Sequence, residues 1–325
     1  MDRLRWPIAL ATIAGLAAAV WAMDKVGFAG LLHAIDRMGW TGFLAFCAAS
    51  LILSLILGAA WWVSMPGQPI ARLPLFAWAR IAREGANDLL PFSQVGGLIV
   101  GARALTRHGL PQARTYAAMV VDLTTEMASQ AAVTLFGVAA LASILINGNR
   151  HHVGPAAWIG VGISIAITAA FIVLQRPMLK LAGGLAEKML PNAPIAFDRL
   201  HEELSDIYAH KGAVALSFLL NLAGWLYAAL LASMALHLIG DPIAFWRIVA
   251  LESLIFALRG AAFVIPGAIG VQEAGYVLLG PLVGLGPEAA VALSLIKRAR
   301  DVALGLPALV IWQALDLRRT AETVR

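Results

Sequence analysis

Long apolar runs alternate with short polar segments along this chain, and the runs have the length of membrane spans. A helix needs about 20 apolar residues to cross the hydrocarbon core of a bilayer. Six runs approach or exceed this length: Pro7–Met23, Thr41–Val63, Thr115–Ile146, Pro155–Leu174, Gly212–Ile239 and Pro287–Leu315. Their Leu, Ala, Ile, Val and Gly content suits helices, which satisfy their own backbone hydrogen bonds in lipid. The pattern predicts about six transmembrane helices.

Two further apolar stretches are interrupted by proline and glycine. They cover residues 63–115 and 240–287. Proline removes a backbone donor and ends or kinks a helix, so each stretch is predicted to form two half-length helices that meet at a break. With both stretches as re-entrant hairpins, the predicted fold is an all-α polytopic membrane protein with about six transmembrane helices and two re-entrant helical hairpins.

The composition excludes a water-soluble globule. Apolar residues make up 60% of the 325 positions and charged residues only 13%, against about 25% in soluble domains. No low-complexity linker divides the chain, so we expect a single integral membrane domain over residues 1–325. The net charge of +5 could suggest a nucleic-acid partner, but no basic stripe with interleaved aromatic residues is present. We therefore expect no such partner.

The distribution of positive charge predicts the orientation. With the N-terminus inside, the inside loops hold sixteen of the 24 Lys and Arg residues, Arg80 and Arg83 among them, and the outside loops hold four. This bias predicts a multi-pass protein of the bacterial inner membrane with both termini in the cytoplasm. The segment 175–211 is predicted to be an amphipathic cytoplasmic connector. A cleaved signal peptide ending near Ala22 is the alternative for the first run.

Two parts of the chain resemble each other. ANDLLPFSQVGGLIVGARAL and RGAAFVIPGAIGVQEAGYVL align on Pro91 and Pro266, and each proline is followed 20 or 21 residues later by another, Pro111 and Pro287. We predict one repeat at about 41–146 and a second at about 212–315, in opposite orientations. Inverted repeats with discontinuous helices are typical of transporters. The predicted helix-break residues are Pro91, Gly96, Gly97, Pro266, Gly267 and Gly270.

Ionisable residues occur inside the predicted spans. Asp122 and Glu126 share a helix face, and the second copy carries a charged group that includes Arg300 and Asp301 about 20 Å along its span. Such charges are costly in lipid and should face a cavity or a partner. Glu252 and Glu273 are the expected partners of the basic residues in the second copy. An ion-pair network that only fixes helix packing is the alternative interpretation.

Signatures of enzymes and metal sites are missing from the sequence. The seven histidines show no metal-binding spacing, and Cys47 is the single cysteine. No nucleophile elbow, P-loop or dinucleotide fingerprint occurs. We therefore expect no catalytic residues, no metal and no cofactor.

Several motifs together resemble a known family. NDLLPFSQVGG, VVDLTTEMASQ, IPGAIGVQEAGYVLLG and ALSLIKRARDVALGLPALVIWQ are similar to the flippase-like transmembrane family related to lysylphosphatidylglycerol synthase. Within that family, the chain is most similar to the hopanoid-biosynthesis-associated membrane proteins of the HpnL type. The resemblance runs from about Leu32 to Leu315. It implies movement of a lipid, with hopanoids or phospholipids as cargo, between the leaflets of the inner membrane.

The residues and the resemblance together give a candidate site in which the two hairpins enclose a polar cavity in mid-membrane. The expected headgroup-binding residues are Asn87, Gln94, Arg259, Gln272, Glu273 and Arg298. The expected ion-pair or proton-exchanging residues are Asp122, Glu126, Arg300 and Asp301. Two alternatives remain: a non-catalytic subunit that presents a lipid to a separate lipid-biosynthesis enzyme, or an enzyme of lipid modification.

Overall fold

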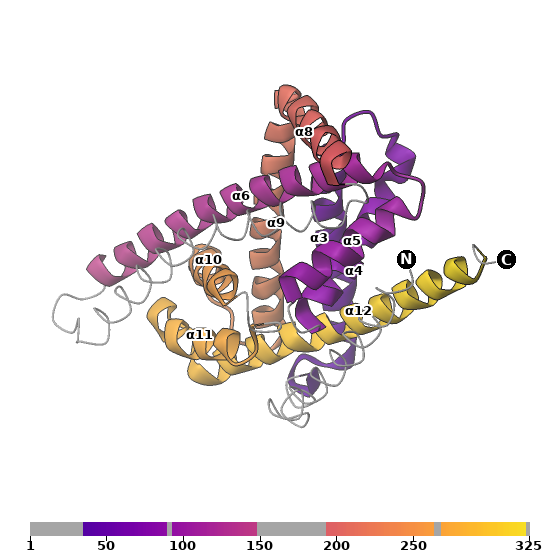
Figure 1. Ribbon diagram of the computed structural model, residues 1–325. Coiled ribbons are helices and arrows are strands. Elements are labelled where there is room, and N and C mark those ends of the chain that lie inside the picture. Colours follow the sequence, from indigo (N-terminus) through magenta and orange to yellow (C-terminus); the bar gives the residue numbers. More distant parts are fainter. Residues whose placement is uncertain (1–34, 90–92, 148–192, 263–267, 323–325) are drawn as a thin grey trace.

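The computed structural model describes residues 35–89, 93–147, 193–262 and 268–322, and the regular elements in these ranges are all helices (Figure 1). Two short 3-10 turns, η2 (Ile70–Arg72) and η4 (Pro281–Val283), separate some of them. The α-helices are α3 (Trp40–Val63), α4 (Leu73–Leu89), α5 (Ser93–Thr106), α6 (Gln112–Asn147), α8 (Ala193–Ala209), α9 (Lys211–Leu238), α10 (Phe245–Ala261), α11 (Val271–Leu279) and α12 (Pro287–Glu322).

Four of the predicted apolar runs coincide with long helices, namely α3, α6, α9 and α12. By length and composition, α3, α6 and α9 are candidate membrane spans. The fourth helix, α12, differs because it carries Lys297, Arg298, Arg300 and Asp301 within five positions. The predicted runs Pro7–Met23 and Pro155–Leu174 lie outside the described residues. The chain is thus all-helical where it is described, and the number of spans and their orientation stay predictions.

Each of the two interrupted stretches forms a pair of antiparallel helices. In the first pair, α4 and α5, Gly97 lies against Asn87 and Gly101 lies against Arg83. The contacts therefore run in opposite directions along the two helices. In the second pair, α10 and α11, Arg259 contacts Gln272 and Glu252 contacts Tyr276, so these two helices are antiparallel as well. We name these pairs hairpin 1 (α4 and α5) and hairpin 2 (α10 and α11).

The two halves of the chain show the same order of elements: a long apolar helix, a hairpin and a second long helix. The halves pack crosswise. Hairpin 1 places α4 against α12 and α5 against α6, whereas hairpin 2 places α10 against α6 and α11 against α12. Figure 1 shows both hairpins between the long helices α6 and α12, while α3 and α9 pack on each other across the molecule. Each hairpin thus touches the last helix of both halves.

Glycine allows the closest of these contacts. A Cβ atom added to Gly85 of α4 would lie 2.9 Å from both Cα and the carbonyl oxygen of Gly305 in α12. Backbone atoms of two helices cannot yield as a flexible side chain can, so this position accepts only glycine without a shift of a helix. Small residues at such crossings are typical of helices that pack in membranes.

We expect Gly85→Ala to lower the stability of the folded protein by about 1–3 kcal/mol, because the added methyl group overpacks the contact between α4 and α12. The measurement is the midpoint of thermal unfolding of the purified protein in detergent. Gly212→Ala is the matched control, since a Cβ at Gly212 in α9 has no neighbour within 4 Å. Equal midpoints for the two variants would show that the close contact is unimportant.

Candidate functional site

A buried cluster of four charged residues joins hairpin 1 to α6. It consists of Arg80 and Arg83 from α4 and Asp122 and Glu126 from α6, and we call it the arginine cluster. Arg80 donates to both carboxylate oxygens of Glu126, at 3.1 and 2.6 Å. Arg83 donates to Asp122 at 3.1 Å and to Glu126 at 2.9 Å. Arg80, Arg83 and Asp122 are at most 2% exposed, so the two positive charges offset two negative charges away from solvent.

The local sequence explains this geometry. Residues three and four apart lie on one helix face, so α4 directs both arginines at the face of α6 that carries both carboxylates. A guanidinium binds a carboxylate through two parallel hydrogen bonds, which fixes the register between the helices. Arg80 also forms an ion pair with Glu84 at 2.9 Å. The Nδ2 of Asn221 from α9 donates to Thr125 at 3.1 Å and lies 3.4 Å from Asp122, which connects the cluster to a third helix.

A second buried cluster joins hairpin 2 to α12. Lys297 donates to Glu252 at 2.5 Å and to the hydroxyl of Tyr276 at 2.7 Å, and that hydroxyl donates to the other oxygen of Glu252. Glu252 and Tyr276 are fully buried and Lys297 is 4% exposed. We call this group the lysine cluster. Its charges are reversed relative to the arginine cluster, because here the hairpin supplies the acid and the long helix supplies the base.

The two hairpins contact each other through an ion pair close to their breaks. Arg259, near the end of α10, donates to Asp88, near the end of α4, at 2.7 Å. The same guanidinium donates to Oε1 of Gln272 in α11 at 2.9 Å. We call these three residues the tip contact. It brings together one helix of hairpin 1 and both helices of hairpin 2.

Further ion pairs surround the tip contact. Arg298 of α12 donates to Glu273 at 3.0 Å, and Glu273 also accepts the backbone N–H of Gly270 at 2.7 Å. Gly270 has a φ of 79° and precedes the first residue of α11, so its glycine permits the turn into the helix. On α12, Arg300 pairs with the adjacent Asp301. The predicted partners of Lys297 and Arg298, Glu252 and Glu273, are therefore the partners observed.

Several buried polar atoms near the tip contact have no hydrogen-bond partner among the described residues. They are Oδ1 of Asn87, Nε2 of Gln272 and Oδ2 of Asp301. Buried polar atoms in native proteins almost always have a partner, and an unpaired atom in a closed site calls for water or a ligand. Oδ1 of Asn87 lies against Gly97 of α5, whereas Nε2 of Gln272 and Oδ2 of Asp301 leave the tip region with one donor and one acceptor that no described residue engages.

The structure brings most of the predicted site residues to these clusters. Arg259, Gln272, Glu273 and Arg298 gather around the tip contact, and Asp122 and Glu126 belong to the arginine cluster. Pro91, Pro266, Gly267 and the side chain of Gln94 lie outside what the structure describes.

The prediction that Gly96 and Gly97 break a helix is wrong. Both lie inside α5, which continues through them. A Cβ atom at Gly97 would meet the backbone carbonyl of Arg83 and the side chain of Asn87. Gly97 therefore serves the close packing of α5 on α4.

Other functional candidates were missed or misplaced by sequence reasoning. Arg80 and Arg83 were counted among loop cations, but each is 2% exposed and paired with acids of α6. Asp88 and Tyr276 were not selected. The signal for Arg80 and Arg83 was their spacing of three residues, which places both on one face of α4, as a spacing of four places Asp122 and Glu126 on one face of α6. Nothing in the sequence pointed to Tyr276. Among the described residues, no group of three or more His, Cys, Asp or Glu side chains could hold a metal ion.

Apolar helices long enough to span a bilayer, with ion pairs buried between them, define a multi-pass helical membrane protein. Comparison with protein families places the chain more narrowly. The family model of the lysylphosphatidylglycerol synthase TM region matches residues 7–308, and the chain belongs to this family. Searches of curated proteins and of solved structures found no match. The match confirms the family resemblance, while the similarity to the HpnL type stays a prediction.

We expect Glu252→Gln and Lys297→Met each to destabilise the protein by about 3–5 kcal/mol, because each leaves a buried charge without its partner. The double variant removes both charges and should lose less than the sum of the single losses, by about 0.5–3 kcal/mol. Denaturant titration of all four proteins in mixed micelles measures this coupling. Strictly additive losses would show that the two side chains do not interact.

Proposed function

We propose that the protein moves a lipid between the two leaflets of the bacterial inner membrane, with the headgroup passing through the polar region at the tip contact. The observation that carries this proposal is the meeting of the two hairpins at the ion pair between Asp88 and Arg259. In the proposed layout, about six helices span the membrane and both hairpins are re-entrant. The halves then form an inverted repeat with both termini in the cytoplasm.

The positions of the charged residues support this proposal. Ionisable groups in the membrane are expensive and usually line the path of a substrate or an ion. Here one ion pair, Asp88 with Arg259, lies at the ends of interrupted helices, which is where transporters with discontinuous helices bind their substrates. A merely structural ion pair between helices would serve as well in mid-helix, but Asp88 and Arg259 lie within three residues of the end of α4 and α10.

The residues around the tips match the chemistry of a lipid headgroup. Arg259 and Arg298 supply positive charge for a phosphate, while Asn87 and Gln272 supply neutral polar atoms that lack partners among the described residues. Glu273 holds Arg298 in place at 3.0 Å. In this proposal the apolar tails stay in the bilayer, and the hydroxyl group of a hopanoid or the headgroup of a phospholipid enters the polar region.

The clusters away from the tips have a supporting role in the proposal. Asp122 and Glu126 hold the arginines of α4, and Asp301 holds Arg300, so that the tips can separate without loss of the fold. The sequence carries no nucleotide-binding motif, so direction comes from a gradient, from trapping or from simple equilibration. The protein performs no chemical step itself and is not an enzyme.

Reconstitution tests the proposal directly. Purified protein in vesicles should move a fluorescent phospholipid from the inner to the outer leaflet faster than empty vesicles do, measured by the fraction that dithionite bleaches over time. Movement at the rate of empty vesicles would contradict transport by this chain alone. If lipid copurifies with such an inactive protein, the result would favour the alternative in which the protein presents a lipid to a separate enzyme.

We expect Arg259→Gln and Asp88→Asn each to slow lipid movement by about tenfold or more, because in this proposal Arg259 binds the headgroup during passage and Asp88 orients Arg259. A charge-assisted hydrogen bond to the headgroup contributes about 1.5–3 kcal/mol, and about 1.4 kcal/mol is a factor of ten in rate. The matched control is Arg37→Gln, which removes an exposed ion pair with Asp241 at 3.1 Å. Its rate should equal that of the wild type. If the tip variants fold and their rates of lipid movement are unchanged, the tip contact serves only the packing of the helices.

A further inference from the structure

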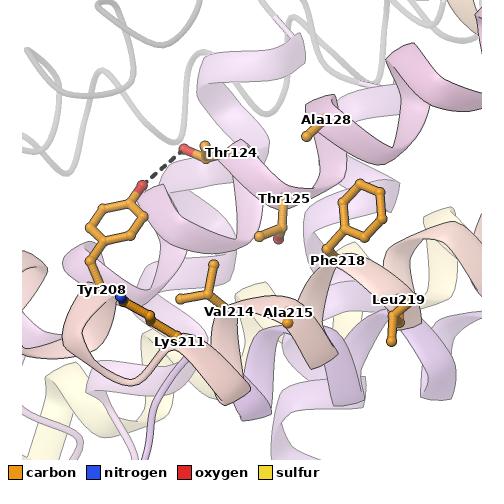
Figure 2. A pocket seen from close by; sticks show the side chains of 9 residues that line it. All are labelled: Thr124, Thr125, Ala128, Tyr208, Lys211, Val214, Ala215, Phe218 and Leu219. Carbon is orange, nitrogen blue, oxygen red and sulfur yellow. Dashed lines mark hydrogen bonds between the residues drawn. The ribbon is translucent and has the colours of Figure 1, made fainter.

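A groove of about 510 Å³ lies between α6, α8 and α9, on helices that do not form the tip contact. Its walls are Thr124, Thr125, Ala128, Tyr208, Lys211, Val214, Ala215, Phe218 and Leu219. Figure 2 shows that Tyr208, Thr124 and Lys211 gather at one end, whereas Phe218 and Leu219 lie at the other. The groove is therefore polar at one end and apolar along the rest of its length, which matches the polar and apolar parts of an amphiphile.

The polar end carries one positive charge that no described residue neutralises. Lys211 is exposed and forms no ion pair within the described ranges. The nearby acids of α8 have another partner, because Glu203 and Asp206 pair with Arg114 at 2.9 and 3.4 Å. Lys211 is also the first residue of α9, where the dipole of the helix adds positive potential.

Tyr208 adds a hydroxyl group that is weakly engaged. Its hydroxyl donates to Thr124 at 3.5 Å, well beyond the usual 2.7–2.8 Å for such a bond. The phenol can therefore exchange this contact for a stronger acceptor at little cost. A phosphate oxygen between Tyr208 and Lys211 would accept from both groups.

The apolar part of the groove runs along a candidate membrane span. It follows the first nine residues of α9, a candidate membrane span, and Leu219 is 56% exposed. These nine residues rise about 12 Å along the helix axis. The groove thus begins where α9 begins and leads along the span.

The floor of the groove adjoins the arginine cluster. Thr125 is 4% exposed, and its hydroxyl lies 2.8 Å from that of Ser217 and accepts from Asn221 at 3.1 Å. Asn221 in turn lies 3.4 Å from Asp122. A ligand in the groove would therefore rest on residues that also hold α6, α9 and hairpin 1 together.

We propose that this groove binds one anionic glycerophospholipid, with its phosphate at Lys211 and Tyr208 and one acyl chain along Val214, Phe218 and Leu219. The positive charge at the polar end of the groove matches an anionic headgroup, and the candidate membrane span beside the groove matches an acyl chain. These two features identify the occupant. The inference is independent of lipid transport, because a site of this kind can hold a lipid whether or not the protein moves it.

Binding is tested with the purified full-length protein in a neutral detergent, titrated with phosphatidic acid and followed by native mass spectrometry. Diacylglycerol with the same chains lacks the phosphate, and phosphatidylcholine has no net charge. We expect phosphatidic acid to bind about tenfold more tightly than either. Comparable binding of glycerol 3-phosphate would overturn the proposal in favour of a soluble phosphate ligand.

Variants distinguish lipid binding in this groove from a general attraction of lipid to positive surface charge. Lys211→Gln should weaken binding of phosphatidic acid about tenfold and Tyr208→Phe about threefold. Ala215→Trp keeps the charge but fills the groove, and since Ala215 is exposed the variant should fold and lose the bound lipid. The matched control is Arg199→Gln, an exposed cation elsewhere on α8, which should bind as the wild type does.

Two further results would overturn the proposal. Equal losses for Lys211→Gln and Arg199→Gln would show diffuse attraction of lipid to a basic surface. A photo-crosslinking residue at position 215 that attaches to another part of the chain, and not to lipid, would show that protein fills the groove. Neither result depends on leaflet-to-leaflet movement, so failure here and failure of transport are distinguishable.

Discussion

Charged side chains inside an apolar helical bundle must meet opposite charges, and this requirement determines how the helices of this protein fit together. Leaving one charge buried alone costs several kcal/mol, so only arrangements that pair the acids of α6 with the bases of α4, and Glu252 with Lys297, are accessible. Apolar helices pack in many registers with similar energy. The ion pairs select one of them, and the glycine contact between α4 and α12 then allows the backbones to approach.

The same principle explains why the charge pattern differs between the halves. In the first half the hairpin carries the arginines and the long helix carries the acids. In the second half these roles are exchanged, with Glu252 on the hairpin and Lys297 on the long helix. Neither arrangement requires a net buried charge. The pair of Asp88 and Arg259 then connects the halves, so the electrostatic network reaches from α6 through both hairpins to α12.

The lengths of the apolar runs and the positions of proline were sufficient to predict the helices but not their neighbours. The runs at 41–63, 115–146, 212–239 and 287–315 became long helices, and the two interrupted stretches became hairpins. Glu252 and Glu273 were identified as candidate partners because intramembrane charges need opposite charges and both acids lie in the second copy, and they contact Lys297 and Arg298. Arg80 and Arg83 were misplaced because arginines in a short amphipathic stretch resemble loop cations, and their burial depends on α6, which is distant in sequence. Gly97 was misinterpreted for a similar reason. A glycine that breaks a helix and a glycine that allows a neighbouring helix to pack closely have the same local sequence.

The crosswise packing of the hairpins has a mechanical consequence. Because α12 touches α4 of one half and α11 of the other, and α6 touches α5 and α10, neither long helix can tilt without displacing parts of both hairpins. A displacement of either long helix would therefore reach both halves of the chain through the hairpins.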